Sequence, residues 1–143
     1  MSPIDRAVLA ERAMSVERHL ARVAARLPPT PDDFEPSTDP SDAVILHLWQ
    51  ATQIIIDLAV SATVASGLGT PQSYADAFRR LEHSGVISAP LADRLVRAAG
   101  FRNVVAHAYE RLDMARVHQA AQVGPADLRA FIAAVARMPM RSE

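Results

Sequence analysis

Residues 41–66 have the sequence SDAVILHLWQATQIIIDLAVSATVAS, and this segment sets the architecture expected for the whole chain. Its large apolar residues recur at helical spacing and cover most of the circumference of a helix, which is the pattern of a central, buried helix. They are Ile45, Leu48, Trp49, Ile55, Ile56, Ala59 and Val60. Gly67 follows as the expected left-handed residue that ends this helix. We therefore predict a central helix over residues 41–66.

Helical patterns also flank this segment on both sides. The expected helices run from Ser2 to Arg26, from Ser41 to Ser66, from Thr70-Pro71 to Gly85, from Ala89 to Tyr109 and from Pro125 to Met138, with a short helical turn at residues 114–119. Ser2 before Pro3 and Ser88 before Ala89 are residue types that cap helix N-termini. Gly100, inside the fourth helix, indicates a kink or the close approach of another helix.

No segment shows the alternating apolar pattern of a strand, so we predict an all-α fold. Four or five helices joined mostly by short connections are typical of an antiparallel up-and-down bundle. The chain has the usual size of one domain, and we expect residues 1–143 to form a single helical domain. Its many helical alanines offer limited side-chain volume for a hydrophobic core within a single subunit. We therefore expect a two-fold homodimer that buries the remaining apolar stripe.

The charge pattern excludes one class of function. The formal net charge is −1, all of the basic residues are arginine, and residues 27–40 form an acidic, proline-rich segment that we expect to be a loop. A chain with this balance has no global positive field, so it is not a general nucleic-acid coat protein. Any contact with RNA has to come from a local cluster of side chains.

Other compositional features indicate a cytoplasmic protein that does not bind to membranes. The chain contains no cysteine, which excludes disulfides and thiolate metal sites. Its first residues lack the apolar core of a signal peptide. The longest apolar run, around residues 54–65, is interrupted by Asp57 and is too short to span a bilayer.

The glycine pair after the central helix and four of the histidines do not indicate a binding or metal site. Gly67-Leu68-Gly69 lacks the lysine frame of a phosphate-binding loop and is expected to be a helix end followed by a turn. His19, His47, His83 and His118 have no second ligand one helical turn away, and we expect each to be a structural histidine at the surface or partly buried. No metal or other cofactor is expected.

Residues 100–109, GFRNVVAHAY, carry the strongest signal for chemistry. On a helix, Asn103 and His107 lie one turn apart on one face, and Arg102 and Tyr109 are nearly eclipsed. We therefore expect these four polar groups to mark one strip of the helix. A guanidinium that binds phosphate beside an imidazole that moves a proton is a minimal set of groups for phosphodiester chemistry. Spacing alone leaves open an ordinary amphipathic helix with a polar face. In both interpretations the apolar residues Val104, Val105 and Ala108 are expected to face the bundle.

The pattern Arg102-Asn103-x-x-x-His107-x-Tyr109 resembles the motif of HepT-like proteins, the toxin branch of the HEPN superfamily. Further blocks fall in the order of that family's pattern, and the likeness covers roughly residues 41–117. These blocks are Ala43-Val44-Ile45, Ile56-Asp57-Leu58-Ala59, Gly67-Leu68-Gly69, Pro71-x-Ser73-Tyr74, Ala77-Phe78 and Gly85-Val86-Ile87. Residues 1–40 and the tail after Gly124 carry no signature of the family.

The resemblance implies an all-helical homodimer that acts as a metal-independent endoribonuclease, in which the motifs of two subunits meet in a cleft. His107 would transfer the proton when a ribose 2′-OH attacks the adjacent phosphate. Arg102 would stabilise the transition state, and Asn103 would position the phosphate or hold the arginine. The implied partner is a nucleotidyltransferase antitoxin of the MntA type, which would neutralise the toxin by adenylylating Tyr109.

Several points stay open at this stage. Asp57 is expected either to orient Arg102 or His107 from the central helix, or to be a polar position with a local hydrogen bond. A rival function is a catalytically silent helical dimer that binds the nucleotidyltransferase, and a third is a nucleotide-binding bundle. For Tyr109, we expect a hydroxyl that opens onto the cleft, on the same strip as Arg102, and the alternative is a ring packed in the core.

Overall fold

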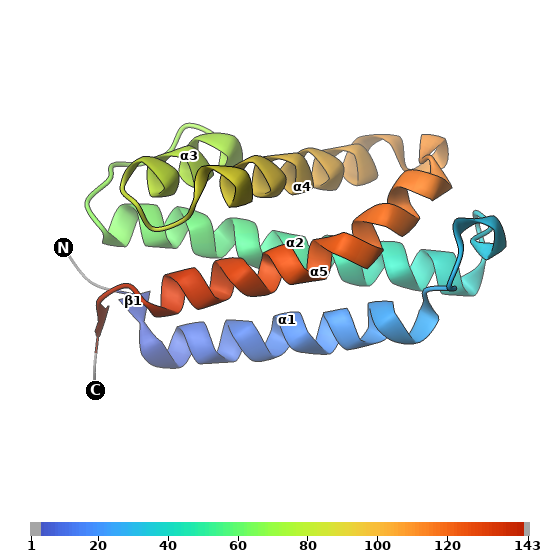
Figure 1. Cartoon of the computed structure of the whole chain (residues 1–143), viewed down its shortest axis with the longest axis horizontal. Coiled ribbons are helices and arrows are strands. Elements are labelled where there is room, and N and C mark those ends of the chain that lie inside the picture. Colours follow the sequence, from blue (N-terminus) through green and yellow to red (C-terminus); the bar gives the residue numbers. More distant parts are fainter. Residues whose placement is uncertain (1–3, 142–143) are drawn as a thin grey trace.

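The described part of the chain, residues 4–141 of a computed structural model, consists of five α-helices, two 3-10 turns and a pair of two-residue strands (Figure 1). In chain order the elements are β1 (Ile4–Asp5), α1 (Arg6–Arg26), η1 (Pro31–Asp33), α2 (Asp39–Ala65), α3 (Tyr74–His83), α4 (Ala89–Ala108), η2 (Tyr109–Arg111), α5 (Met114–Ala136) and β2 (Met140–Arg141). Figure 1 shows the long helices α1, α2, α4 and α5 alternating in direction. The predicted all-helical fold is confirmed, and the strand pair is a small exception that the sequence analysis missed.

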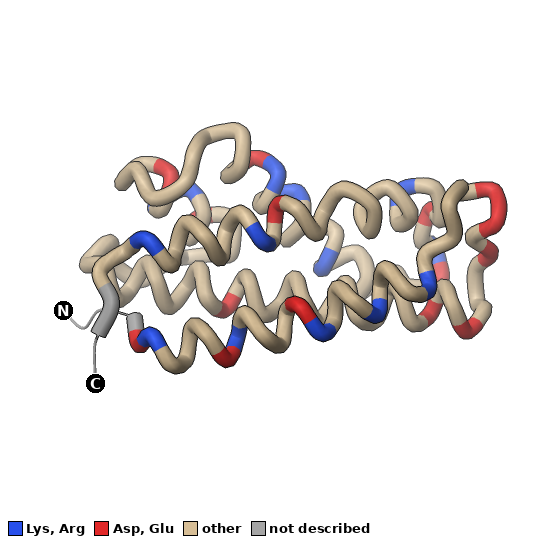
Figure 2. The backbone as a smooth tube through the Cα atoms, turned by 60° about the horizontal axis from the view of Figure 1, so that its bottom comes forward, with Lys and Arg blue, Asp and Glu red and all other residues tan. Residues whose placement is uncertain are grey.

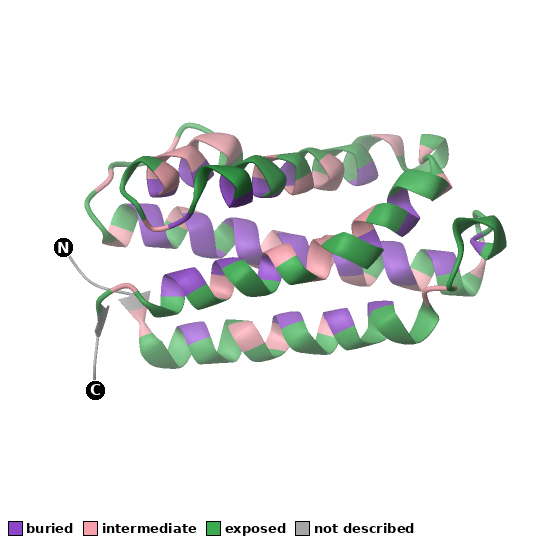
Figure 3. Ribbon diagram, in the orientation of Figure 1, coloured by how far each residue is buried: buried purple, intermediate pink, exposed green. Residues whose placement is uncertain are grey.

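Helix α2 lies at the centre of the bundle, as predicted. It contacts each of the other four α-helices, and Figure 3 shows buried positions along most of its length. The prediction that its apolar run is too short to span a bilayer is wrong for the helix as a whole: among the described residues α2 is the one helix whose length and hydropathy suffice to cross a membrane. Half of its most apolar window is, however, buried inside the bundle. This is the property expected of the core helix of a helical protein.

The two ends of α2 follow from local capping. Thr38 and Ser41 form a reciprocal capping box, so the helix begins at Asp39, two residues before the predicted start. At the other end Gly67 has a φ of 78°, the left-handed conformation that a glycine adopts without steric cost, as predicted. The direction in which α2 leaves the acidic loop is therefore set by side-chain to backbone hydrogen bonds.

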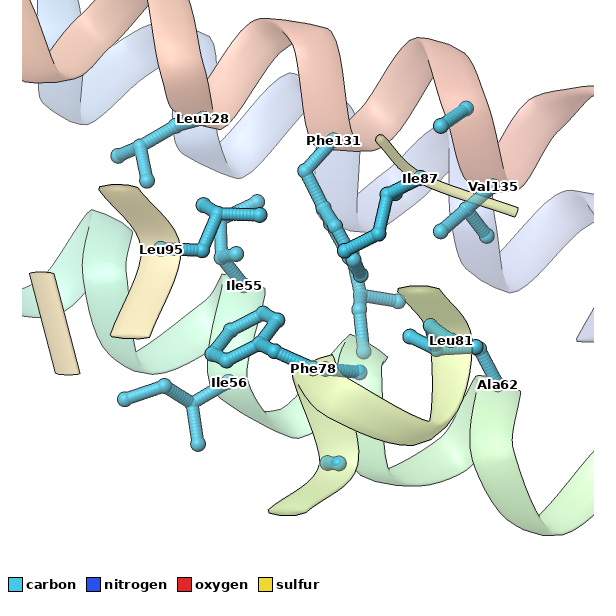
Figure 4. Packing of buried hydrophobic residues seen from close by; sticks show 14 of the residues in the cluster. Ile55, Ile56, Ala62, Phe78, Leu81, Ile87, Leu95, Leu128, Phe131 and Val135 are labelled. Carbon is cyan, nitrogen blue, oxygen red and sulfur yellow. The ribbon is translucent and has the colours of Figure 1, made fainter. Parts of the chain in front are cut away.

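The core consists of two clusters along the bundle. In the larger one, the Phe78 and Phe131 rings meet edge to face with centroids 5.7 Å apart, which joins α3 to α5 above α2 (Figure 4). The smaller cluster lies near the end of α4 and includes Val105 and Val117. The segment that carries the candidate motif is therefore anchored on its own part of the core.

Helix α5 corrects the sequence prediction most strongly. A turn at residues 114–119 and a separate helix from Pro125 to Met138 were expected, but one helix runs from Met114 to Ala136 with Pro125 inside it. Asp113 caps its start by accepting hydrogen bonds from the backbone of Ala115 and Arg116. A proline costs one hydrogen bond of an α-helix and introduces a clash, but the buried face of α5 packs on both core clusters and keeps the helix continuous.

The starts of two other helices also differ from the prediction. Helix α1 is capped by Asp5, whose carboxylate accepts from the backbone N–H groups of Ala7 and Val8. The predicted cap at Ser2-Pro3 lies outside the described residues. Helix α3 begins at Tyr74 after the cap residue Ser73, not at Thr70-Pro71. In both cases a capping residue slightly later in the sequence than the predicted one accepts the hydrogen bonds of the first backbone N–H groups.

The acidic, proline-rich segment is a loop that is held at two points, although a 3-10 turn and the first two residues of α2 lie within residues 27–40. The Phe34 ring is buried in the smaller core cluster at 4% exposure. His118, on α5, forms a 2.7 Å hydrogen bond with the Pro28 carbonyl and is 3% exposed. His118 is therefore fully buried, in contrast to the prediction of a surface or partly buried histidine.

A short parallel strand pair joins the two ends of the described chain. Ile4 lies opposite Met140 and Asp5 opposite Arg141. Figure 1 shows β1 beside the end of α5, at the end of the bundle opposite to the C-terminus of α4. Runs of two residues are too short to show an alternating pattern, which is why the sequence did not predict them.

Candidate active site

Arg102 lies on α4 and is held by uncharged groups of α2, α3 and its own helix. Its Nε donates to the side-chain oxygen of Gln53 at 2.7 Å, and its Nη1 donates to Asn103 at 3.1 Å. The guanidinium carbon lies 5.5 Å from the centre of the Trp49 ring and 5.7 Å from the Tyr74 ring. Within residues 4–141 no carboxylate forms an ion pair with Arg102, so its positive charge remains available to an anion.

Asp57 is linked to Arg102 through the side chain of Gln53. The Gln53 amide nitrogen donates to the Asp57 carboxylate at 3.0 Å, while the Gln53 oxygen accepts from Arg102. The carboxylate therefore fixes which end of the amide faces the guanidinium. Both alternatives expected for Asp57 are present in part: its hydrogen bond is local, one turn away on α2, and the amide that it orients holds Arg102.

Neither Gln53 nor Trp49 was predicted from the sequence to be a site residue. A signal was nevertheless present, because Trp49, Gln53 and Asp57 follow one another at intervals of four residues on α2. Such a row lies on one face of a helix. The sequence alone did not predict that α4 would place Arg102 against this row.

His107 lies apart from Arg102 within one chain. The two residues are five positions apart on α4, which turns their side chains by about 140° around the helix axis. His107 is exposed and lines a shallow hollow of about 480 Å³ at the end of α4, together with Tyr109 and Arg111. Asn103 is also exposed and lies about 40° from His107 around the same axis. Among the described residues, no hydrogen bond or ion pair joins His107 to Arg102. The prediction that the four polar groups of the motif mark one strip is therefore wrong.

Tyr109 leaves the helix that was expected to carry it. The backbone breaks at Ala108, which has φ −143° and ψ 40°, and Tyr109 begins the 3-10 turn η2. The prediction that Tyr109 is nearly eclipsed with Arg102 is therefore wrong, because it assumed a continuous helix. The ring is 43% exposed and lies outside the core.

The Tyr109 hydroxyl instead faces the first turn of α2. It donates a 2.5 Å hydrogen bond to Asp42 Oδ1. Burial of the hydroxyl, and then its hydrogen bond to and the negative charge of Asp42, raise the pKa of Tyr109 to about 12. Asp42 was not singled out from the sequence, because 67 positions separate it from Tyr109.

The apolar residues of the motif are only partly buried. Val105 packs in the smaller core cluster and Ala108 is half-buried, but Val104 is 47% exposed. The prediction that Val104 faces the bundle is therefore wrong, because nearly half of this residue is exposed to solvent. An exposed valine beside Asn103 leaves an apolar contact surface next to the motif.

A stripe on α2 is also left uncovered by the other helices. We define the α2 stripe as the exposed or half-exposed residues spaced three or four apart along its length: Asp42, Leu46, Gln50, Gln53, Asp57, Ser61 and Val64. Leu46 is 49% exposed and Val64 is 46% exposed. Arg102 and Tyr109 both hydrogen-bond to members of this stripe, so the candidate site lies along its edge.

Two of the histidines expected to stand alone form a pair. The Nδ1 atoms of His19 on α1 and His47 on α2 lie 3.0 Å apart. Burial lowers the pKa of both rings, as do the positive charges of nearby arginines, among which Arg22 acts on both. Figure 2 shows the basic residues that gather on the second half of α1. His83 is exposed, as predicted.

Two further hollows lie elsewhere on the molecule. One, of about 660 Å³, lies between the ends of α2, α3 and α5 and has Arg137 as its charged side chain. Another, of about 440 Å³, lies between α4 and α5, with Arg97 and Arg116 at its rim and Arg94 paired to Asp127 at 2.8 Å. Neither hollow contains His107 or Tyr109. Within residues 4–141 no three His, Asp or Glu side chains gather as a metal-ligand group.

Comparison with known proteins gives consistent likenesses. The family model for ribonuclease HepT-like proteins matches residues 16–135. A curated relative, the mRNA nuclease HepT of Shewanella oneidensis, is 35% identical over 91 residues, which are 64% of this chain and 68% of that protein.

Solved structures of toxin–antitoxin complexes share the fold. The tri-AMPylated HEPN toxin of Shewanella oneidensis, in complex with its MNT antitoxin, has a TM-score of 0.83 and 27% identity, covering 92% of this chain and 98% of that one. A toxin–antitoxin structure with AMP-PNP has a TM-score of 0.85 and 26% identity, covering 93% and 100%.

Proposed function

Because the chain belongs to the ribonuclease HepT-like family, we propose that it is the toxin of a HEPN/MNT toxin–antitoxin pair and that it cleaves RNA with Arg102 and His107. The observation that carries the proposal is that Arg102 is held in place while its positive charge stays unpaired among the described residues. It is fixed by an amide and two aromatic rings, and none of these groups neutralises its charge. A guanidinium held in this way is ready to bind a phosphate without first leaving a carboxylate partner.

The proposed reaction is attack of a ribose 2′-OH on the adjacent phosphorus, without a bound metal. The 2′-oxygen–phosphorus bond forms and the bond to the 5′-oxygen of the next nucleotide breaks. His107 takes up the proton of the 2′-OH and a proton is delivered to the leaving 5′-oxygen, since an imidazole can both accept and donate a proton. Arg102 stabilises the charge of the pentavalent transition state, and Asn103 positions the phosphate beside it.

We further propose that the active site is built from two subunits. Within one chain Arg102 and His107 diverge by about 140° around α4, so one chain alone does not direct both side chains at one phosphate. A two-fold contact along the part of the α2 stripe between Leu46 and Val64 would cover these two apolar residues and bring two copies of the motif to the same edge. The first turn of α2, with Asp42, would stay uncovered. The homodimer predicted from the sequence is thus proposed on this face.

The proposed partner is a nucleotidyltransferase antitoxin of the MntA type, and the proposed point of control is Tyr109. Its ring is exposed and shares the hollow at the end of α4 with His107. AMP added to its hydroxyl would place phosphate and a bulky nucleoside in the space where RNA has to bind. Modification and steric cover by the bound partner can act together.

The test of the nuclease is cleavage of bulk RNA in EDTA by the wild-type chain and by His107→Ala. His83→Ala is the matched control, because His83 is also an exposed helical histidine. We expect products ending in 2′,3′-cyclic phosphate from the wild type and from His83→Ala, and a loss of 100-fold or more in His107→Ala, on the order of a missing general acid or base.

Three results would contradict the proposed nuclease. Equal cleavage by the wild type and His107→Ala would exclude the assigned role of His107. No cleavage by the wild type, together with tight binding of the nucleotidyltransferase, would favour the catalytically silent binding partner. Saturable nucleotide binding without cleavage would favour the nucleotide-binding bundle.

A further inference from the structure

We propose that Asp42 is the general base that accepts the phenolic proton of Tyr109 when a nucleoside triphosphate transfers its nucleotidyl group to that hydroxyl. The proposal rests on the modification of Tyr109 proposed above and adds a catalytic residue to it. In this reaction the toxin is the acceptor substrate, and Asp42 is part of the toxin. The acceptor would therefore supply its own base to the transferase.

The geometry places the carboxylate on the reacting atom. Tyr109 Oη lies 2.5 Å from Asp42 Oδ1, and the hydroxyl is the donor. Asp42 sits in the first turn of α2, where its backbone N–H bonds to the Thr38 carbonyl. The capping box at Thr38 and Ser41 thus fixes the turn from which the carboxylate projects. Both residues are exposed, so a transferase can reach them.

The break in the backbone at Ala108 creates this pair. If α4 continued as a helix, Tyr109 would project nearly above Arg102, two turns along. Instead Ala108 has φ −143°, η2 begins, and the hydroxyl is directed to Asp42. Among the described residues, the Tyr109 hydroxyl hydrogen-bonds only to Asp42. Within residues 4–141 no ion pair neutralises the Asp42 carboxylate.

The chemistry requires a base at this position. Burial and the hydrogen bond to Asp42 raise the pKa of Tyr109 to about 12, so the phenolate is very scarce at neutral pH. The proton therefore has to leave as the new bond forms. A carboxylate that accepts the proton of a substrate hydroxyl is the arrangement that protein kinases use for transfer to serine or tyrosine.

The step balances as follows. Tyr109 Oη attacks the α-phosphorus of the nucleoside triphosphate, and an oxygen–phosphorus bond forms. The bond between that phosphorus and the bridging oxygen to the β-phosphate breaks, and pyrophosphate leaves with the electron pair. The phenolic proton passes to Asp42 Oδ1 and from there to solvent, since the carboxylate is exposed.

Asp42→Asn separates a base from a residue that merely positions the tyrosine. The amide oxygen accepts the same hydrogen bond but cannot take up the proton at neutral pH. Asp39→Asn is the matched control, because Asp39 is an exposed aspartate of the same first turn of α2. Tyr109→Phe removes the acceptor and identifies the site of any added mass.

The experiment is a single-turnover time course with saturating nucleotidyltransferase, ATP and Mg²⁺, followed by intact mass. We expect the first addition of AMP to the full chain to be roughly 100-fold slower in Asp42→Asn and unchanged in Asp39→Asn, the scale of general-base catalysis. We also expect the Asp42→Asn rate to rise with pH up to about pH 10, as the phenolate replaces the missing base, while the wild-type rate stays flatter.

The outcomes distinguish this inference from the proposed function. Equal rates in the wild type and Asp42→Asn would overturn the role of Asp42 and leave Tyr109 modification intact. A slow Asp42→Asn rate with the same flat pH profile as the wild type would assign Asp42 to positioning alone and would also overturn the base. If the wild type gains no mass in units of AMP, or Tyr109→Phe gains the same mass, the proposed modification itself is wrong. Thermal melting of Asp42→Asn checks that the variant is folded.

Discussion

At the scale of single residues, the candidate site depends on how one cation is held. Arg102 is flanked by Trp49 and Tyr74 and bonded to Gln53, which is itself oriented by Asp57. Four groups from two helices therefore restrict a flexible side chain before any substrate arrives. Restriction of this kind lowers the entropy that has to be lost in the transition state.

Gln53 should accordingly matter for RNA cleavage without touching the RNA. We expect Gln53→Ala to lower kcat/KM by about 10-fold to 100-fold, because Arg102 loses its oriented acceptor. Gln53→Glu should be worse, because a carboxylate on Nε would neutralise the guanidinium. The measurement is steady-state cleavage of one RNA substrate. Gln122→Ala, an exposed glutamine on α5 outside the α2 stripe, is the control, and an equal loss in that variant would argue against a specific role of Gln53.

The His19–His47 pair makes stability depend on pH. Burial first, and then the neighbouring charges, lower the pKa of both rings below the unfolded value of 6.5. The folded state therefore binds fewer protons than the unfolded state in this range. The stabilising contribution is fully present above about pH 6.5 and is lost as the pH falls below it. We expect urea unfolding of His47→Gln to show a smaller loss of stability between pH 7 and pH 5 than the wild type and the exposed-residue control His83→Gln. Identical slopes in all three proteins would contradict the assignment.

At the scale of elements, α4 contains a position that weakens it without an evident packing reason. The sequence suggested that Gly100 marks a kink or a close helix approach, but a Cβ built there meets nothing within 4 Å. The close approach is therefore wrong. In an exposed helical position, glycine costs roughly 1 kcal/mol relative to alanine.

Gly100→Ala should therefore stabilise the chain. We expect the free energy of unfolding to rise by about 0.5–1 kcal/mol, which corresponds to a rise in Tm of a few degrees for a domain of this size. Thermal and urea unfolding followed by circular dichroism would measure it. A lower Tm in Gly100→Ala would mean that this surface of α4 is closely covered in the assembled protein.

The same elements show how far the sequence could predict the structure. Helix α2 was predicted to within two residues at its start, because its apolar periodicity is strong and a glycine ends it. Helix α5 was divided in error, because Pro125 has a local cost that the burial of residues such as Phe131 overrides only in the folded protein. The break at Ala108 has no local signal, so the position of Tyr109 could not be predicted. The contacts of Arg102 depend on which helix packs beside α4, which is a property of the tertiary fold.

At the scale of the whole molecule, the uncovered α2 stripe is the feature that most needs a partner. It combines apolar residues with the groups that hold Arg102 and Tyr109. We expect Leu46→Glu to convert a homodimer to a monomer and to abolish RNA cleavage, because it places a charge in the apolar contact that the stripe would form. Light scattering coupled to gel filtration measures the mass. Met14→Glu, an apolar position on α1 that is 62% exposed, should remain a dimer, and dissociation of both variants or of neither would contradict the proposed face.

The strand pair at the ends of the bundle has a consequence for the topology of the chain. Ile4 and Met140 are opposite each other, so the path of the backbone nearly returns to its starting point. A linker of a few residues between the two ends would close the polypeptide into a ring. The ring could then be opened elsewhere, and the acidic loop between α1 and α2 offers one such place. A circularly permuted chain opened there would keep every α-helix intact, and its first residues would lead directly into the first turn of α2, which carries Asp42.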